Sequence, residues 1–434
     1  MCASISVVGK RAKAAISGRS RVLGPLARWP AALAARPSRL QWKRRRKAGT
    51  GSGFDSWPAK SQSGRHLSLA YRLALSHSHE PMLRSIALSG LFLLALVTQG
   101  CDVGSASPPP PVYDPSALEL GNDSEVGAGD LGPTPVALHG KLHVTGTELR
   151  DESDQRVQLK GVSSMWLNWE DDGYAESLEG LKWLRNNWNL SLIRAAMGIT
   201  PNGAYLTDPE KAEAQVTKIV DNAIEAGVYV MIDWHEEKAP EHQAESVDFF
   251  SRMATKYAGV PNVLYEPFNE PTGLTWAQIK PYHEAVVAAI RAADPGNESI
   301  VVLGTPNWSQ DVDLAAQDKL VGNNLMYTLH FYSCTHGGYL ISKAKLAMLR
   351  GAPLFVTEWG ATNADGGLDG EVCLDKAQEW MNFLKPAGIG WAAWKFDNCK
   401  DSTCFLSPDA PLDGGWTSEY LRGEGLFLRA RMQE

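Results

Sequence analysis

Eight apolar runs of strand length alternate with amphipathic segments, and this alternation constrains the fold more than any other feature. The runs lie at residues 157–162, 190–197, 228–234, 263–268, 300–304, 325–332, 353–358 and 389–396. Runs that are apolar throughout are typical of parallel strands that helices cover on both faces. Eight such units in about 290 residues predict an α/β fold, a (β/α)8 TIM barrel.

Helical periodicity fills the intervals between the runs. The expected helices are 177–188, 209–226, 244–257, 276–293, 311–316, 340–349, 374–384 and 418–431. A short N-terminal hairpin is expected around Thr145 and Gly146. A doubly wound open sheet is the alternative, but no Gly-x-Gly-x-x-Gly opens a helix after the first run, which argues against a dinucleotide fold.

Charge and composition divide the chain of 434 residues into four parts. Residues 1–81 carry 16 basic residues against two acidic ones, and the remainder carries 26 basic against 47 acidic ones. We expect 1–81 to be a disordered basic leader outside the mature protein, and 102–135, rich in Pro, Gly, Ser and acidic residues, to be a linker. Residues 136–434 are the expected catalytic domain, and its acidity argues against nucleic acid as a partner.

Residues 82–101 have the pattern of an export signal. Arg84 precedes an apolar stretch at 85–97 that is too short to span a bilayer. A glycine followed by Cys101 ends the stretch, as in bacterial lipoprotein signals, where the cysteine carries the lipid. The sequence therefore predicts a location outside the cytoplasm, with plain secretion and a lipid anchor at Cys101 as alternatives.

Two of the apolar runs end in a glutamate, Glu270 and Glu358. In a barrel, the C-terminal ends of the strands form the functional face, so both carboxyl groups are expected there. Two carboxyl groups on one face are what a glycosidase needs: Glu270 as general acid, carrying a proton at the working pH, and Glu358 as an ionised nucleophile. Arg194 and Tyr332 are candidate donors to Glu358. A surface ion pair is the alternative for either glutamate alone.

Other polar and aromatic residues collect at the same strand ends. Asn269 is placed to bind a sugar hydroxyl, and His235 and His330 to line the cleft, although each is also a common structural residue. Trp169 and Trp394 are expected sugar platforms, since aromatic faces suit stacking. No compact His-Glu-x-x-His spacing exists, so no metal site is predicted.

Residues 136 to about 425 resemble glycoside hydrolase family five, in particular its bacterial endoglucanase branch. The motifs that carry the resemblance are 159–164, 193–197, 232–235, 269–271, 304–311, 327–332, 357–360 and 391–394. The resemblance implies a retaining (β/α)8 hydrolase of β-1,4-glucans that needs no cofactor. We also expect the protein to be a monomer. The resemblance further implies that Tyr205 and Trp169 line more distant sugar subsites, and that Met165 stands where the family often has His.

Four cysteines remain beside Cys2 and Cys101, and they allow three pairings. Cys399 with Cys404 would close the loop after the eighth run, and Cys334 with Cys373 would join two loops of the functional face. Free thiols are the alternative, less expected in an exported protein.

The function predicted from these observations is endo-acting, retaining hydrolysis of β-1,4-glucosidic bonds in cellulose and related soluble β-glucans. A β-mannanase or a mixed-linkage or xyloglucan hydrolase is the alternative on the same scaffold. A surface glycan-binding protein without catalysis is the alternative from another class.

Overall fold

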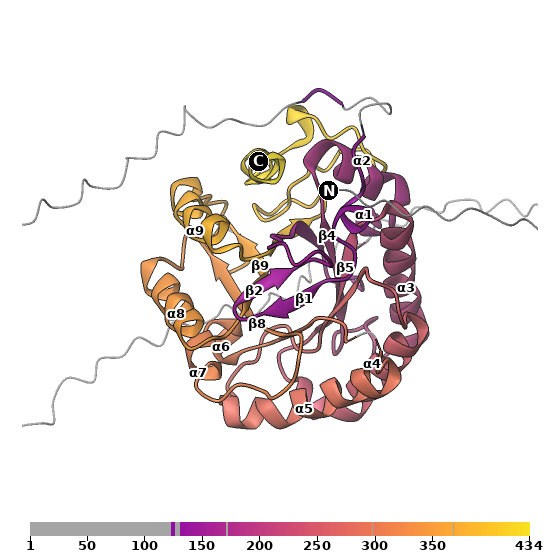
Figure 1. Ribbon diagram of the computed structural model, residues 1–434. Coiled ribbons are helices and arrows are strands. Elements are labelled where there is room, and N and C mark those ends of the chain that lie inside the picture. The colour runs from indigo at the N-terminus through magenta and orange to yellow at the C-terminus, as the bar shows by residue number, and fades with distance from the viewer. Residues whose placement is uncertain (1–122, 126–130, 171, 297, 368) are drawn as a thin grey trace, which may run out of the picture. The chain divides into compact units, whose positions relative to one another are not determined.

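A closed barrel of eight parallel strands forms the centre of the computed structural model, in the order β10-β3-β4-β5-β6-β7-β8-β9. The structure describes residues 123–125, 131–170, 172–296, 298–367 and 369–434. Figure 1 shows the helices arranged outside the strands. The predicted (β/α)8 barrel is therefore confirmed, and the open-sheet alternative is wrong.

The barrel strands are short and almost completely buried. Their bounds are β3 Lys160–Ser164, β4 Leu192–Gly198, β5 Tyr229–His235, β6 Val263–Glu266, β7 Val301–Leu303, β8 Leu325–Tyr332, β9 Leu354–Gly360 and β10 Trp391–Phe396. Side chains that point outward meet the helices and those that point inward fill the barrel, which is why these runs lack polar alternation. Gly161 allows β3 to approach β4, since an added Cβ would lie 2.0 Å from the Leu192 carbonyl oxygen.

From α2 onward the helices lie in the chain between or after the barrel strands. Their bounds are α1 Pro135–His139, α2 Leu178–Trp188, α3 Pro209–Ala226, α4 Gln243–Lys256, α5 Trp276–Ala293, α6 Pro306–Ser309, α7 Val312–Ala315, α8 Gly338–Leu349, α9 Leu374–Ala387 and α10 Gly425–Gln433. In α3, the Asp208 side chain accepts from the Lys211 amide at the start and Gly227, at φ 70°, ends the helix. None of the helices in the described ranges is long and apolar enough to cross a membrane.

A two-stranded antiparallel hairpin closes the end of the barrel where the strands begin. It consists of β1 His143–Thr145 and β2 Glu148–Arg150. Leu142 and Leu149 of this region join a cluster with Tyr229, Leu264 and other side chains from the first residues of the barrel strands. The predicted hairpin is confirmed, and its position leaves the opposite end of the barrel, where the strands finish, open for a site.

The predicted last helix, 418–431, is wrong at its start. Residues Ser418–Tyr420 form one 3-10 turn, Leu421 is extended, and α10 begins only at Gly425. Gly423 has φ 53° and its backbone lies against the carbonyl oxygen of Ser402, so the chain leaves helical geometry there. Close packing on a distant loop, which helical periodicity does not report, decides this boundary.

The predicted leader 1–81 and the signal at 82–101, including Cys101, lie outside the described residues. Within the predicted linker, Asp123 accepts a hydrogen bond of 2.9 Å from the Ser418 amide and pairs with Arg429. Both expected disulfides are present, Cys334–Cys373 and Cys399–Cys404. The first joins the loops after β8 and β9, and the second closes the loop after β10.

Candidate active site

The two glutamates singled out in the sequence meet at the C-terminal end of the barrel. Glu270 follows β6, and Glu358 is the fifth residue of β9. An oxygen of each and a ring nitrogen of His330 all lie within 4.8 Å of one another. Glu358 is 5% exposed and Glu270 is half-buried. The barrel therefore brings together carboxyl groups that are 88 residues apart in the chain.

Arg194 of β4 lies at the centre of the site and is fully buried. Its Nε donates to Glu266 Oε2 at 2.7 Å, its Nη1 to Glu358 Oε2 at 3.1 Å, and its Nη2 to Asn269 Oδ1 at 2.6 Å. Nη2 also lies 2.9 Å from Asp233 Oδ2. Burial works to lower the pKa of Arg194, but the three carboxylates outweigh burial and raise it, so the guanidinium stays charged.

Glu358 receives the two donors expected for an ionised nucleophile. Arg194 binds Oε2, and the Tyr332 hydroxyl donates to Oε1 at 2.6 Å. Burial, together with the nearby Glu358 carboxylate, raises the pKa of Tyr332 well above its ordinary value. Tyr332 therefore remains a neutral donor, and the two hydrogen bonds hold both oxygens of Glu358 in place.

His330 of β8 connects Glu270 to a buried carboxylate below the site. Its Nδ1 lies 3.2 Å from Glu270 Oε1 and its Nε2 lies 2.8 Å from Thr357 Oγ1. The Thr357 hydroxyl in turn donates to Glu266 Oε1 at 2.6 Å. Burial acts to lower the pKa of His330, but the carboxylates of Glu266 and Glu270 outweigh it and raise the pKa to about 9.

His235 of β5 orients Asn269. Its Nδ1 lies 2.6 Å from Asp233 Oδ2 and its Nε2 lies 3.3 Å from Asn269 Nδ2. Burial and then the charge of Arg194 lower the pKa of His235 to about 3, so the ring is neutral. Nδ1 then carries the hydrogen that binds Asp233, and Nε2 accepts from the Asn269 amide. With its oxygen on Arg194, the Asn269 side chain has a single orientation.

Aromatic rings continue from the carboxyl pair toward solvent. Trp394 stacks on His235 with centroids 5.3 Å apart, His235 meets Trp166 edge-on at 4.4 Å, and Trp166 stacks on Trp169 at 4.8 Å. Trp394 is buried, whereas Trp169 is 41% exposed. Met165 packs against the cluster that contains Tyr332 and Trp394. The rings thus form a continuous aromatic path out of the site.

Tyr205 is more buried than we expect of a residue that lines a sugar subsite. It is 6% exposed, its ring contacts Trp234 and Phe249, and its hydroxyl accepts from Arg252 at 3.1 Å. Trp234 is next to His235 in β5. The described contacts of Tyr205 therefore connect it to the wall beside the site, and its contact with sugar remains a prediction.

The candidate list made from the sequence lacked the buried groups beneath the site. Glu266, Asp233, Thr357 and Ser163 contact Arg194 or His330, and all are 0% exposed. A signal for two of them was present in the sequence. Asp233 and Glu266 are carboxylates inside apolar runs, and a charge in a buried strand requires a partner.

Three groups of described side chains have the spacing to hold a metal ion. Two include Cys334 with Cys373 and Cys399 with Cys404, whose sulfurs form disulfides. The third is Glu270, His330 and Glu358. These three residues are the carboxyl pair and the histidine that contacts Glu270.

Comparison with known proteins agrees with this geometry. The family model Cellulase (glycosyl hydrolase family 5) matches residues 150–400. Endoglucanase 5 of Pectobacterium carotovorum subsp. carotovorum is 40% identical over 308 residues, which are 70% of this chain and 59% of that protein. Endoglucanase A of Evansella cellulosilytica is 43% identical over 284 residues, or 64% of this chain and 57% of that protein.

A solved structure extends the similarity to three dimensions. The catalytic domain of a Thermobifida fusca endoglucanase aligns with a TM-score of 0.65 at 30% identity, over 69% of this chain and all of that one. The chain spans less than two thirds of the length of the two curated relatives above, so the likeness concerns their shared barrel. The chain belongs to glycoside hydrolase family 5.

Proposed function

We propose that the protein is an endo-acting β-1,4-glucanase that cleaves cellulose chains and related soluble β-glucans with retention of configuration. The observation that carries the proposal is the carboxyl pair, in which one oxygen of Glu270 lies within 4.8 Å of one oxygen of Glu358. Retaining glycosidases hold their two carboxyl groups about 5 Å apart, whereas inverting ones need a wider gap that admits water. The separation in this barrel supports the retaining mechanism.

In the first step, Glu358 attacks the anomeric carbon while Glu270 protonates the glycosidic oxygen that leaves. The new bond is a glycosyl ester to Glu358, and the old C–O bond breaks with its electron pair taken by the protonated leaving oxygen. Arg194 and Tyr332 hold the attacking carboxylate in place, so its geometry is prepared before substrate arrives.

In the second step, Glu270 takes a proton from water as the water attacks the same anomeric carbon. Glu358 leaves as a carboxylate, and its charge returns to the donors Arg194 and Tyr332. His330, at 3.2 Å from Glu270, is in position to hold the acid–base residue and to share its proton. Asn269, held by Arg194 and His235, is the residue we propose to bind a sugar hydroxyl.

The aromatic path suits a β-linked glucan chain. Such a chain has apolar faces on its sugar rings, and Trp394, Trp166 and Trp169 belong to a series of contacting rings that runs from the buried Trp394 to the exposed Trp169. The Thermobifida fusca catalytic domain in one aligned structure, at a TM-score of 0.65, is in complex with cellotetraose. We therefore assign a β-1,4-glucan chain as the partner of this path.

We also propose that the enzyme works as a monomer outside the cytoplasm, secreted or anchored through Cys101. Two disulfides in the barrel loops support an oxidising location. Mass spectrometry of the protein from membrane and medium fractions tests the anchor: a lipid on an N-terminal Cys101 supports it, and an unmodified terminus refutes it.

The test of function is hydrolysis of carboxymethylcellulose beside the Glu358→Gln and Glu270→Gln variants. Each variant is expected to lose activity by orders of magnitude while it stays folded. Glu225→Gln, an exposed glutamate on α3, is the matched control and should keep full activity. Anomer analysis by NMR should show retention. Mannan as the only substrate hydrolysed would refute the glucanase, and wild-type rates in either variant would refute the assignment of that residue.

A further inference from the structure

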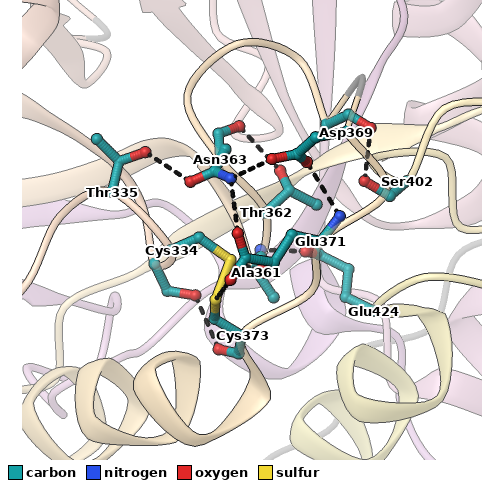
Figure 2. Close-up of a disulfide and its surroundings, with 12 residues drawn as sticks. Cys334, Thr335, Ala361, Thr362, Asn363, Asp369, Glu371, Cys373, Ser402 and Glu424 are labelled. Atoms are coloured by element: carbon teal, nitrogen blue, oxygen red, sulfur yellow. Dashed lines mark hydrogen bonds between the residues drawn. A yellow bond between two sulfur atoms is a disulfide. The ribbon is translucent and has the colours of Figure 1, made fainter.

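Glu424, at the N-terminal cap of α10, is a completely buried acid that the mechanism above does not use. It is 0% exposed and lies outside the segment that matches the family model. Figure 2 shows its carboxyl group directed at Ala361, beside the Cys334–Cys373 disulfide. Ala361 is the residue that follows β9, three positions after Glu358.

We propose that Glu424 is a positioning residue that fixes the end of β9 and thereby the geometry of Glu358 for its attack. The inference rests on the proposed function, since it takes Glu358 as the nucleophile. Glu424 Oε2 accepts a hydrogen bond from the Ala361 amide. Ala361 is itself 0% exposed, so this amide has no access to water and depends on the carboxyl group.

Backbone hydrogen bonds from two other loop regions hold the same segment, residues 360–362. The Gly360 carbonyl accepts from the Ser333 amide at 2.8 Å, and the Ala361 carbonyl accepts from the Cys373 amide at 2.7 Å. The Cys334 amide donates to the Thr362 carbonyl at 3.1 Å. The disulfide joins the two cysteines that make these bonds. Glu424 supplies the remaining anchor, on the amide of Ala361.

A displacement of the backbone at Ala361 would move both Glu358 and its hydrogen-bond donor Tyr332. The Tyr332 ring lies so close to the Gly360 backbone that an added Cβ would be 2.9 Å from it. Tyr332 donates to Glu358 at 2.6 Å, and Glu358 is two residues before Gly360. A displacement of about 1 Å in a reacting group is enough to slow chemistry by about a hundredfold. The contact at Ala361 therefore bears on catalysis and not only on stability.

Glu424 acts as a neutral carboxyl group on a rigid support. No ion pair to it occurs among the described residues, its Oε1 has no hydrogen-bond partner there, and burial raises its pKa well above the ordinary value. Its neighbours Gly423 and Gly425 have backbones in contact with the carbonyl oxygens of Ser402 and Phe405. The start of α10 is thus held by the loop after β10, and Glu424 holds β9 in turn.

The test is the rate at which a 2-deoxy-2-fluoro-cellobiosyl fluoride labels the full-length protein, followed by intact mass and normalised to the folded fraction. Glu424→Gln, which keeps the acceptor and the neutral state, is expected to label within about threefold of wild type. Glu424→Leu removes the acceptor, and Glu424→Asp withdraws it by one methylene. Both variants are therefore expected to label at about one tenth of the wild-type rate or more slowly still. On oligosaccharide, kcat should fall while KM stays unchanged.

Leu149→Ala is the control for general destabilisation, because Leu149 is buried at the other end of the barrel. It should lower the thermal midpoint but label at the wild-type rate. Wild-type labelling by both Glu424→Leu and Glu424→Asp, or equal slowing by Leu149→Ala, overturns the inference while the proposed function stands. A wild-type protein that carries no label on Glu358 overturns the proposed function, and the inference with it.

Discussion

Glu266→Gln tests whether the site depends on buried charge compensation beneath the carboxyl pair. Glu266 is fully buried and accepts from Arg194 at 2.7 Å and from Thr357 at 2.6 Å. Burial alone would raise its pKa, but Arg194 and then His330 outweigh burial and lower it to about 2. The substitution keeps the shape of the side chain, removes its charge and replaces one of its two acceptor oxygens by a donor, so the loss measures the charge together with one hydrogen bond.

The magnitude follows from the pKa of Glu266. A fall from its ordinary value of 4.5 to about 2 corresponds to roughly 3 kcal/mol at about 1.36 kcal/mol per unit. Removing one partner of a buried ion pair costs about 3–5 kcal/mol, which agrees. The folded-state pKa is depressed, so this stabilisation is fully present above pH 4.5 and is lost as the pH falls through about 2.

Urea unfolding near neutral pH is the assay, with Glu225→Gln as the control. Glu225 is exposed and pairs with Lys182 at 3.1 Å, an interaction worth less than about 1 kcal/mol. Glu266→Gln should be about 3 kcal/mol less stable than wild type, and the difference should shrink at low pH. A loss below about 1 kcal/mol, or one that grows as the pH falls, would show that the charge of Glu266 does not balance Arg194.

The remaining predictions concern the other groups of the site. Tyr332→Phe removes a charged-acceptor hydrogen bond worth about 2 kcal/mol, so kcat should fall by roughly thirtyfold in steady-state assays, and an unchanged kcat would exclude the role. The pKa of His330 is raised to about 9, so its protonated form is lost as the pH rises through about 9, and kcat/KM should decline there; a flat profile around that pH contradicts the pairing with Glu270. Trp169→Ala should raise KM for long oligosaccharides by roughly fivefold, for about 1 kcal/mol of stacking, and leave short substrates unaffected. The Cys334→Ser, Cys373→Ser double variant removes a disulfide of sequence separation 39, and its free energy of unfolding in urea should fall by about 4 kcal/mol. Removing the Cys399–Cys404 disulfide, of separation 5, should lower it by about 2 kcal/mol. The reverse order would contradict the loop-closure explanation.

The barrel and the positions of its two main carboxyl groups could be predicted because the burial of a strand determines the hydrophobic pattern of its sequence. A strand covered on both faces must be apolar throughout, so eight such runs give eight strands, and their ends give the functional face. Glu270 and Glu358 stand where apolar runs stop, and the closed barrel brings them within 4.8 Å. The donors to Glu358 could be named for the same reason, since Arg194 and Tyr332 belong to runs of the same barrel.

Features that depend on contacts between distant segments produce no recognisable sequence pattern. The start of α10 depends on Gly423 packing against Ser402, and a helical pattern over 418–431 contains no sign of that contact. Glu424 reads as an ordinary polar residue of a helical segment, yet it is 0% exposed and binds the strand end that follows Glu358. Periodicity reports how much of a side chain is buried on average, but not which partner a buried polar atom meets.

Arg194 shows why the partners beneath the site matter as much as the residues at its surface. Its planar guanidinium presents donors in fixed directions, and these meet Glu266 through Nε, Glu358 through Nη1 and Asn269 through Nη2. Glu266, whose pKa is lowered mainly by Arg194, compensates the charge, and Glu266 and Asp233 hold the Nε and Nη2 atoms of the group while Nη1 binds Glu358. The fully buried carboxyl groups of Glu266 and Asp233 therefore help to set the direction in which Glu358 is held, through the Arg194 side chain that they share with it.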